Sequence, residues 1–136
     1  MQRILYISTA RTPISTPELN AILAASRRNN AAVGITGLLV VGGRRFLQVL
    51  EGPEASVTAT YDRIIKDPRH YAFVKLNDKI VTERCFADWA MGFEAGGEPS
   101  NAAPLDEQVA ALIAPIADAN LRAYFTGFAN KHAAAA

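Results

Sequence analysis

Three polar side chains lie in otherwise apolar segments of this sequence, and they are the residues best suited to binding a ligand. Tyr6 lies in the run RILYIST, Gln48 lies in the run RRFLQVL, and Asn30 ends a helical pattern. A buried amide without a hydrogen-bond partner costs about 1–3 kcal/mol, so Gln48 needs a partner. Tyr6 is the nearest candidate if the two strands are neighbours. A phenol and two carboxamides between apolar walls suit a planar ring with amide-like edges.

The sequence lacks the residue sets that other kinds of chemistry require. Cys85 is its only cysteine, which excludes an internal disulfide and a zinc site built from cysteines. We find no carboxylate pair, no histidine cluster, no Ser-His-Asp arrangement and no phosphate-binding glycine loop. We therefore expect a binding pocket without a metal, and we expect Cys85 to pack rather than to react.

Composition and charge indicate one globular domain. The chain has 136 residues, of which 50% are hydrophobic and 20% are charged, and this is enough apolar material for one core. A net charge of +1 provides no strong field for nucleic acid or an anionic membrane. The apolar runs end well before 18 residues and the first residues lack a signal-peptide layout, so we expect a cytoplasmic protein.

The spacing of apolar residues predicts five strands and four helices. The strands are expected at residues 3–9, 35–41, 44–50, 71–76 and 85–93, and the charged stretch 77–84 can be partly extended. The helices are expected from an N-cap at Thr16, from residue 54 until Pro68, at 105–113 and at 118–128. Residues 96–100 mark a change in composition, so we divide the chain into 1–95 and a helical cap and tail, 96–136, within one compact unit.

This order of elements predicts an α+β fold with a ferredoxin-like β-α-β-β-α-β-β sheet. Two helices would lie on one face and the C-terminal cap helices on the other. We expect the first and third strands to be central, parallel neighbours. Alternation along these strands gives one face to Ile4, Tyr6 and Ser8, and one to Phe46, Gln48 and Leu50.

The helices and the last strand also have predicted apolar faces. These faces are Leu19, Ile22, Leu23, Ser26 and Asn30 in the first helix; Val57, Tyr61, Ile64 and Ile65 in the second; Ala87, Trp89, Met91 and Phe93 on the last strand; and Leu121, Tyr124, Phe125 and Phe128 in the last helix. Apolar cap residues such as Phe125 and Phe128 favour a homo-oligomer, a dimer or larger.

Six segments, in order along the chain, resemble the BLUF domain, the blue-light sensor that uses FAD. They are LYIS at 5–8, SRRNN at 26–30, GITGLL at 34–39, FLQVLEGP at 46–53, DPRH at 67–70 and FADWAM at 86–91. The resemblance covers about residues 3–93, and the remainder resembles the helical cap of short, stand-alone members. It implies a photoreceptor that binds FAD without a covalent bond, has no catalytic output domain of its own, and signals to a partner protein.

The resemblance also implies residue roles. Tyr6 matches the photoactive tyrosine, which passes an electron and a proton to the excited flavin, and Gln48 matches the glutamine that then rearranges reversibly. Trp89 and Met91 match the pair on the last strand that reports this change. The other implied cofactor-binding residues are Ile22 and Ile64 against the ring, Asn29 and Asn30, with Asn30 at the ring edge, and Arg63, Asp67, Arg69 and His70 toward the ribityl and polar end.

Each of these residues also has an ordinary structural interpretation. Tyr6 can be a core aromatic, Gln48 can bind a loop backbone, and Asn29 and Asn30 can end a helix. Arg63 and Asp67 can form an i,i+4 surface pair, His70 can bound the second helix, and Trp89 and Met91 can simply belong to the strand core.

Two other functions fit the same fold. The first is a flavin-dependent redox enzyme, which the lack of an additional acid, base or nucleophile disfavours. The second is a non-catalytic interaction module such as an RNA-binding domain. The near-zero net charge disfavours RNA as a partner.

Overall fold

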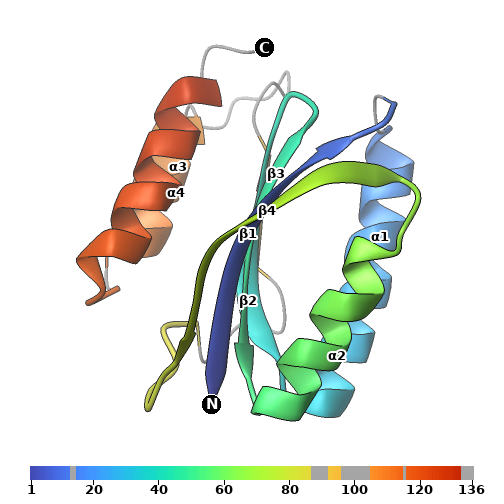
Figure 1. Ribbon diagram of the computed structural model, residues 1–136. Helices are drawn as coiled ribbons and strands as arrows, with labels where there is room; N and C mark the ends of the chain where they lie inside the picture. Colours follow the sequence, from blue (N-terminus) through green and yellow to red (C-terminus); the bar gives the residue numbers. More distant parts are fainter. Residues whose placement is uncertain (13–14, 87–91, 96–104, 115, 133–136) are drawn as a thin grey trace.

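The protein folds as a single five-stranded sheet with helices on both faces (Figure 1). The computed structural model describes residues 1–12, 15–86, 92–95, 105–114 and 116–132. The strands are β1 (Gln2–Ala10), β2 (Thr36–Gly42), β3 (Arg45–Gly52), β4 (His70–Ile80) and β5 (Gly92–Ala95), in the order β4-β1-β3-β2-β5. The helices α1 (Thr16–Val33) and α2 (Glu54–Ile65) cover one face, and α3 (Leu105–Ile113) and α4 (Ala119–His132) cover the other. The predicted α+β architecture is confirmed.

The direction of the central pair was predicted wrongly. β1 and β3 are neighbours, but they are antiparallel, with Tyr6 opposite Gln48. The crossover through α1 makes β1 and β2 run in the same direction. Because β3 returns from β2 in a hairpin and lies between these two strands, it must be antiparallel to both. The parallel pair of this sheet is instead β2 with β5.

The last two strands also differ from their predicted bounds. β4 takes in the first part of the charged stretch and ends at Ile80. Cys85 and Phe86, predicted to begin the last strand, lie outside it, because their backbone N–H groups donate to the side chain of Glu51 instead of to a strand neighbour. Ala87, Trp89 and Met91 lie outside the described residues.

The N-cap of helix α1 is Ser15 and not, as the sequence predicted, Thr16, which is the first residue of the helix. The hydroxyl of Ser15 accepts a hydrogen bond from the backbone N–H of Glu18, the third residue of the helix, as an N-cap side chain does. The helix ends at Gly34, whose φ of 74° is readily adopted by glycine. Asn29 and Asn30 are therefore helical residues and not the C-cap.

The two faces of the sheet bury two separate cores, as the alternation of residues predicts. The core beneath α1 and α2 includes Ile4, Tyr6, Leu19, Leu23, Phe46, Leu50, Val57 and Tyr61. The core beneath α3 and α4 includes Leu5, Leu38, Val40, Leu47, Val49, Phe86, Val109, Ile113, Phe125 and Phe128. Among the described helices, none is long and apolar enough to cross a membrane.

The predicted apolar helix faces need correction at two residues, and one inference from them loses its basis. Phe125 and Phe128 are buried against the sheet, so they provide no exposed surface for a homo-oligomer, and the oligomeric state itself stays a prediction. Ile65 and Tyr124 are each 40% exposed, although both were placed on buried faces. Each directly adjoins a core-facing residue, and a step of one residue turns a side chain about 100° around the helix.

Candidate functional site

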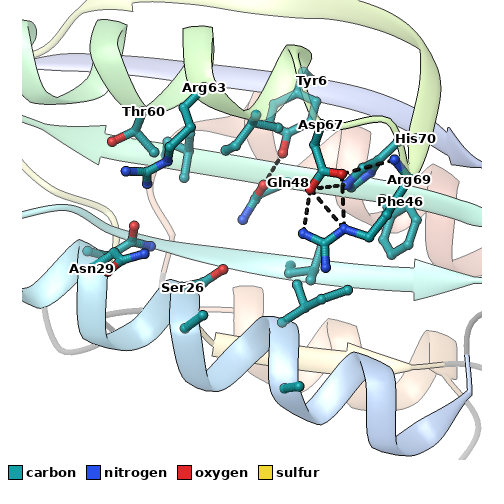
Figure 2. A pocket seen from close by; sticks show the side chains of 17 residues that line it. Tyr6, Ser26, Asn29, Phe46, Gln48, Thr60, Arg63, Asp67, Arg69 and His70 are labelled. Atoms are coloured by element: carbon teal, nitrogen blue, oxygen red, sulfur yellow. Dashed lines mark hydrogen bonds and ion pairs between the residues drawn. The ribbon is translucent and has the colours of Figure 1, made fainter.

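A cavity of about 320 Å³ lies between α1, α2 and the sheet face that carries Tyr6 and Gln48 (Figure 2). Pockets that hold small molecules and cofactors commonly measure about 300–1,000 Å³. All ten side chains predicted to bind a cofactor line this cavity. They are Tyr6, Ile22, Asn29, Asn30, Gln48, Arg63, Ile64, Asp67, Arg69 and His70.

Tyr6 and Gln48 meet at the floor of the cavity. They are cross-strand neighbours on β1 and β3, and the Tyr6 hydroxyl donates a hydrogen bond to Oε1 of Gln48. Burial, with the nearby Tyr61 and Asp67, raises the pKa of Tyr6 well above its usual value of about 10. The phenol therefore keeps its proton at every physiological pH. Figure 2 shows the amide nitrogen of Gln48 turned away from Tyr6.

Aromatic rings fix the orientation of the Tyr6 ring. The ring of Tyr61, from α2, lies edge-on at a centroid distance of 5.3 Å, and that of Phe73, from β4, lies 6.0 Å away. Lys75 is exposed to solvent, and its ammonium lies 4.9 Å from the centre of the Tyr61 ring. Because packed rings allow few rotamers, the Tyr6 hydroxyl is held toward Gln48.

Helix α1 supplies the wall opposite α2. Ile22, Ser26, Asn29 and Asn30 recur every three or four residues, so they share one helix face and point into the cavity. Asn30 is buried and Asn29 is exposed. Across the cavity, Ile64 and Thr60 have the same four-residue spacing on α2.

Several cavity residues were not among the predicted site residues. These are Ala21, Ala25, Ser26, Leu39, Phe46, Leu50 and Thr60. The same periodicity could have identified most of them, because Ser26 is four residues from Ile22, Thr60 is four from Ile64, and Phe46 and Leu50 flank Gln48 at two-residue spacing.

A cluster of charged side chains lines one end of the cavity. The carboxylate of Asp67 accepts hydrogen bonds from the backbone N–H and the Nε of Arg69, each at 2.9 Å, and from Nη2. These bonds hold the pKa of Asp67 at about 2. Asp67 thus pairs with Arg69 and not with Arg63, which rules out the surface-pair interpretation. Figure 2 shows Arg63 near Asn29 and Thr60, away from this cluster.

His70 lines the cavity and is the first residue of β4, whereas α2 already ends at Ile65. Its contact with the polar end of a cofactor stays a prediction. Its Nδ1 lies 3.4 Å from the hydroxyl of Ser8 and its Nε2 lies 3.8 Å from Asp67. Ser8, His70 and Asp67 thus lie in a row, but the distance between His70 and Asp67 is too long for a hydrogen bond. Burial lowers the pKa of His70, so its ring is neutral at pH 7. Both distances exceed those of an activated nucleophile, and Ser8 is buried outside the cavity wall.

The Asp67–Arg69 pair predicts a pH dependence of stability. The pKa of Asp67 rises from about 2 in the folded protein to about 3.9 on unfolding, so the unfolded chain binds more protons between these values. The stabilisation from Asp67 is complete above about pH 5 and falls as the pH drops toward 2. In urea titrations, the midpoint difference between the wild type and Asp67→Asn should shrink from pH 5 to pH 2.5. A difference that stays constant over this range contradicts the pairing.

The residues present fit a flavin. Ile22 on α1 and Ile64 on α2 can flank a planar ring, and the carboxamides of Asn30 and Gln48 can meet its polar edge. The guanidinium groups of Arg63 and Arg69 can meet phosphate oxygens. Among the described residues, no group of three or more His, Cys, Asp or Glu side chains could hold a metal ion.

Comparison with known proteins identifies the family. Residues 1–92 match the family model for BLUF, sensors of blue-light using FAD. The chain belongs to the BLUF family. It is therefore a blue-light sensor module whose cofactor is FAD.

Curated relatives of this BLUF domain are much longer proteins. The chain is 37% identical over 89 residues to the photoactivated adenylate cyclase subunit beta of Euglena longa, covering 65% of the chain and 10% of that protein. It is 36% identical over 73 residues to the blue light- and temperature-regulated antirepressor BluF of Escherichia coli K12, covering 54% of the chain and 18% of that protein. The chain thus spans less than one fifth of these relatives.

Solved structures share the fold. The dark-state structure of the BLUF protein BlrB superposes with a TM-score of 0.70 at 24% identity, and 96% of each chain is covered. The photo-activated state of BlsA gives a TM-score of 0.71 at 23% identity, with 99% of this chain and 96% of that chain covered. Both likenesses confirm the predicted α+β fold class.

Proposed function

We propose that Tyr6 and Gln48 are the light-dependent switch of this sensor. The observation that supports this role best is their buried hydrogen bond at the wall of the cavity. When bound, FAD supplies the group that absorbs blue light and that can accept an electron and a proton. Tyr6 is the residue that would give up both to the excited group and take both back, so that the cofactor ends in its original oxidation state and only the hydrogen bonds differ.

The rearrangement of the Gln48 amide is the change that persists after illumination ends. Its amide has two different ends, an acceptor and a double donor, and only the acceptor faces Tyr6 in this structure. A half-turn of the amide would place Nε2 against the phenol, whose oxygen would then accept. No covalent bond of the protein needs to break, so the dark arrangement can return thermally.

The remaining cavity residues are proposed to hold the cofactor. Ile22 and Ile64 flank the ring, and Asn29 and Asn30 bind its polar edge together with Gln48. At the charged end, the Asp67–Arg69 pair is fixed by four hydrogen bonds, and His70 packs beside Phe46 at a centroid distance of 5.1 Å. This set is proposed to hold the ribityl and phosphate part, and Arg63 is proposed to contact the same part of the cofactor from its separate position near Asn29 and Thr60.

Residues 1–95 are proposed to form the flavin-binding domain, and residues 96–136 its helical cap and tail. This sensor is proposed to signal to a partner protein rather than to catalyse a reaction, with Trp89 and Met91 reporting the switch.

Illumination of the FAD-loaded protein tests this proposal. More hydrogen bonding at the ring edge lowers the energy of the flavin transition, so blue light should shift the visible band to longer wavelength, and the band should return in the dark. A band that stays in place under illumination would refute the switch. Turnover of an added electron acceptor at enzymatic rates would instead support the redox enzyme.

A further inference from the structure

A row of polar side chains crosses the sheet on the face that α3 and α4 cover. Lys79, Arg3, Glu51 and Thr36 are successive neighbours across β4, β1, β3 and β2. Most of the remaining buried side chains on this face are apolar. Arg3 is 5% exposed and Glu51 is completely buried. A buried charge is strongly unfavourable unless other groups form hydrogen bonds or ion pairs with it, so Arg3 and Glu51 both need such partners.

Glu51 binds the chain segment that leads into β5. Its carboxylate accepts hydrogen bonds from the backbone N–H of Cys85 at 3.0 Å and of Phe86 at 2.5 Å. Arg84 adds hydrogen bonds to the backbone oxygen of Glu51 at 3.2 Å and to the hydroxyl of Thr36 at 2.8 Å. Residues 84–86 are therefore fixed to β3 and to the start of β2.

The same segment contacts the start of α4. The guanidinium of Arg3 donates to the sulfur of Cys85 at 3.2 Å and to the carboxylate of Asp118 at 2.5 Å. Asp118 also binds Lys79 at 2.9 Å and accepts from the backbone N–H of Leu121, in the first turn of α4. In addition, the ring of Phe86 packs edge-on against Phe125 of α4.

We propose that Glu51 is a positioning residue that couples β3 to the cap helix α4. Gln48 and Glu51 are three residues apart on β3, so their side chains point to opposite faces of the sheet. Gln48 faces the flavin cavity, and Glu51 holds Cys85 and Phe86, which contact Arg3 and α4. A movement of β3 at Gln48 would therefore reach α4 through this carboxylate. The light-dependent part of this inference rests on the proposed switch.

Hydrogen exchange in the dark tests the contact itself. In Glu51→Gln the amide nitrogen cannot accept, so one of the two backbone N–H groups loses its partner. At least one of the amide protons of Cys85 and Phe86 should exchange at least about tenfold faster than in the wild type. Glu54→Gln makes the same chemical change at an exposed residue of α2 and should leave these rates unchanged. Unchanged rates in Glu51→Gln would overturn the proposal.

Illumination tests the coupling. In the wild type, light should change amide exchange in the first turn of α4. In Glu51→Gln, the flavin band should shift as in the wild type while the α4 change is lost. The proposal is overturned if α4 still responds in this variant, if its flavin shift is lost, or if wild-type α4 does not respond. A wild type without a flavin shift would refute the proposed switch, and the dark comparison would still decide on the Glu51 contact.

A second variant covers the case in which Glu51→Gln fails to fold. Asp118→Asn keeps the contact between Glu51 and residues 85–86 but weakens the bonds of α4 to Arg3 and Lys79. The dark exchange of Cys85 and Phe86 should stay within about twofold of the wild type, and the light response of α4 should be lost. An α4 response of wild-type size would contradict the proposed route.

Discussion

Replacing Tyr6 with Phe is expected to abolish the light-induced shift of the flavin band while FAD stays bound. The variant keeps the ring that packs against Tyr61 and Phe73, but it removes the hydroxyl that donates to Gln48. Loss of one buried hydrogen bond costs about 1 kcal/mol, and an acceptor left without a donor costs up to about 3 kcal/mol, so the fold should survive. Light-minus-dark absorption spectra, with the bound FAD measured beforehand, check this result.

Tyr61→Phe is the matched control for this prediction. It removes the same atom from the neighbouring ring, which packs against Tyr6 but does not line the cavity. This variant should keep the shift. A shift of wild-type size in Tyr6→Phe would place the photoactive group elsewhere, and loss of the shift in Tyr61→Phe as well would show that ring packing, rather than the Tyr6 hydroxyl, decides the response.

Replacing Gln48 with Leu is expected to abolish the shift as completely, for a different reason. Leucine is similar in size and packs well between Phe46 and Leu50, but it has neither the acceptor nor the donors that the switch needs. The hydroxyl of Tyr6 loses its acceptor, which costs about 1–3 kcal/mol, and the added apolar burial offsets part of this cost. Absorption spectra under illumination and urea unfolding midpoints measure the two effects.

Gln2→Leu is a suitable comparison for this second variant. Gln2 lies at the start of β1, and its amide binds Asp78 and Thr58 outside the cavity. Its replacement should leave the flavin shift unchanged. If Gln48→Leu retained the full shift, the rearranging group would have to be another cavity residue, and Asn30 would be the next carboxamide to replace.

The placement of the central pair of the site could be predicted from sequence. A strand alternates its side chains with a period of two, so Tyr6 and Gln48 had to point to the same side if β1 and β3 were neighbours. The direction of β3 needed one further argument. A strand that returns from a hairpin and lies between two strands joined by a crossover must run against both of them, and the prediction left this out.

Other features depended on contacts between residues distant in sequence. The last predicted strand begins too early because Glu51, more than thirty residues before it, takes the backbone donors of Cys85 and Phe86. Phe125 is buried because the sheet offers an apolar face that α4 covers. Local patterns cannot reveal such partners.

The most direct test of the switch is to observe the Gln48 amide itself. The side-chain N–H signals of Gln48 can be recorded by nuclear magnetic resonance on FAD-loaded protein labelled with ¹⁵N, and Gln48→Leu identifies them by their disappearance. We predict that these signals move under blue light and return in the dark at the rate at which the flavin band recovers. A flavin band that shifts and recovers while the Gln48 signals stay in place would contradict the proposed switch.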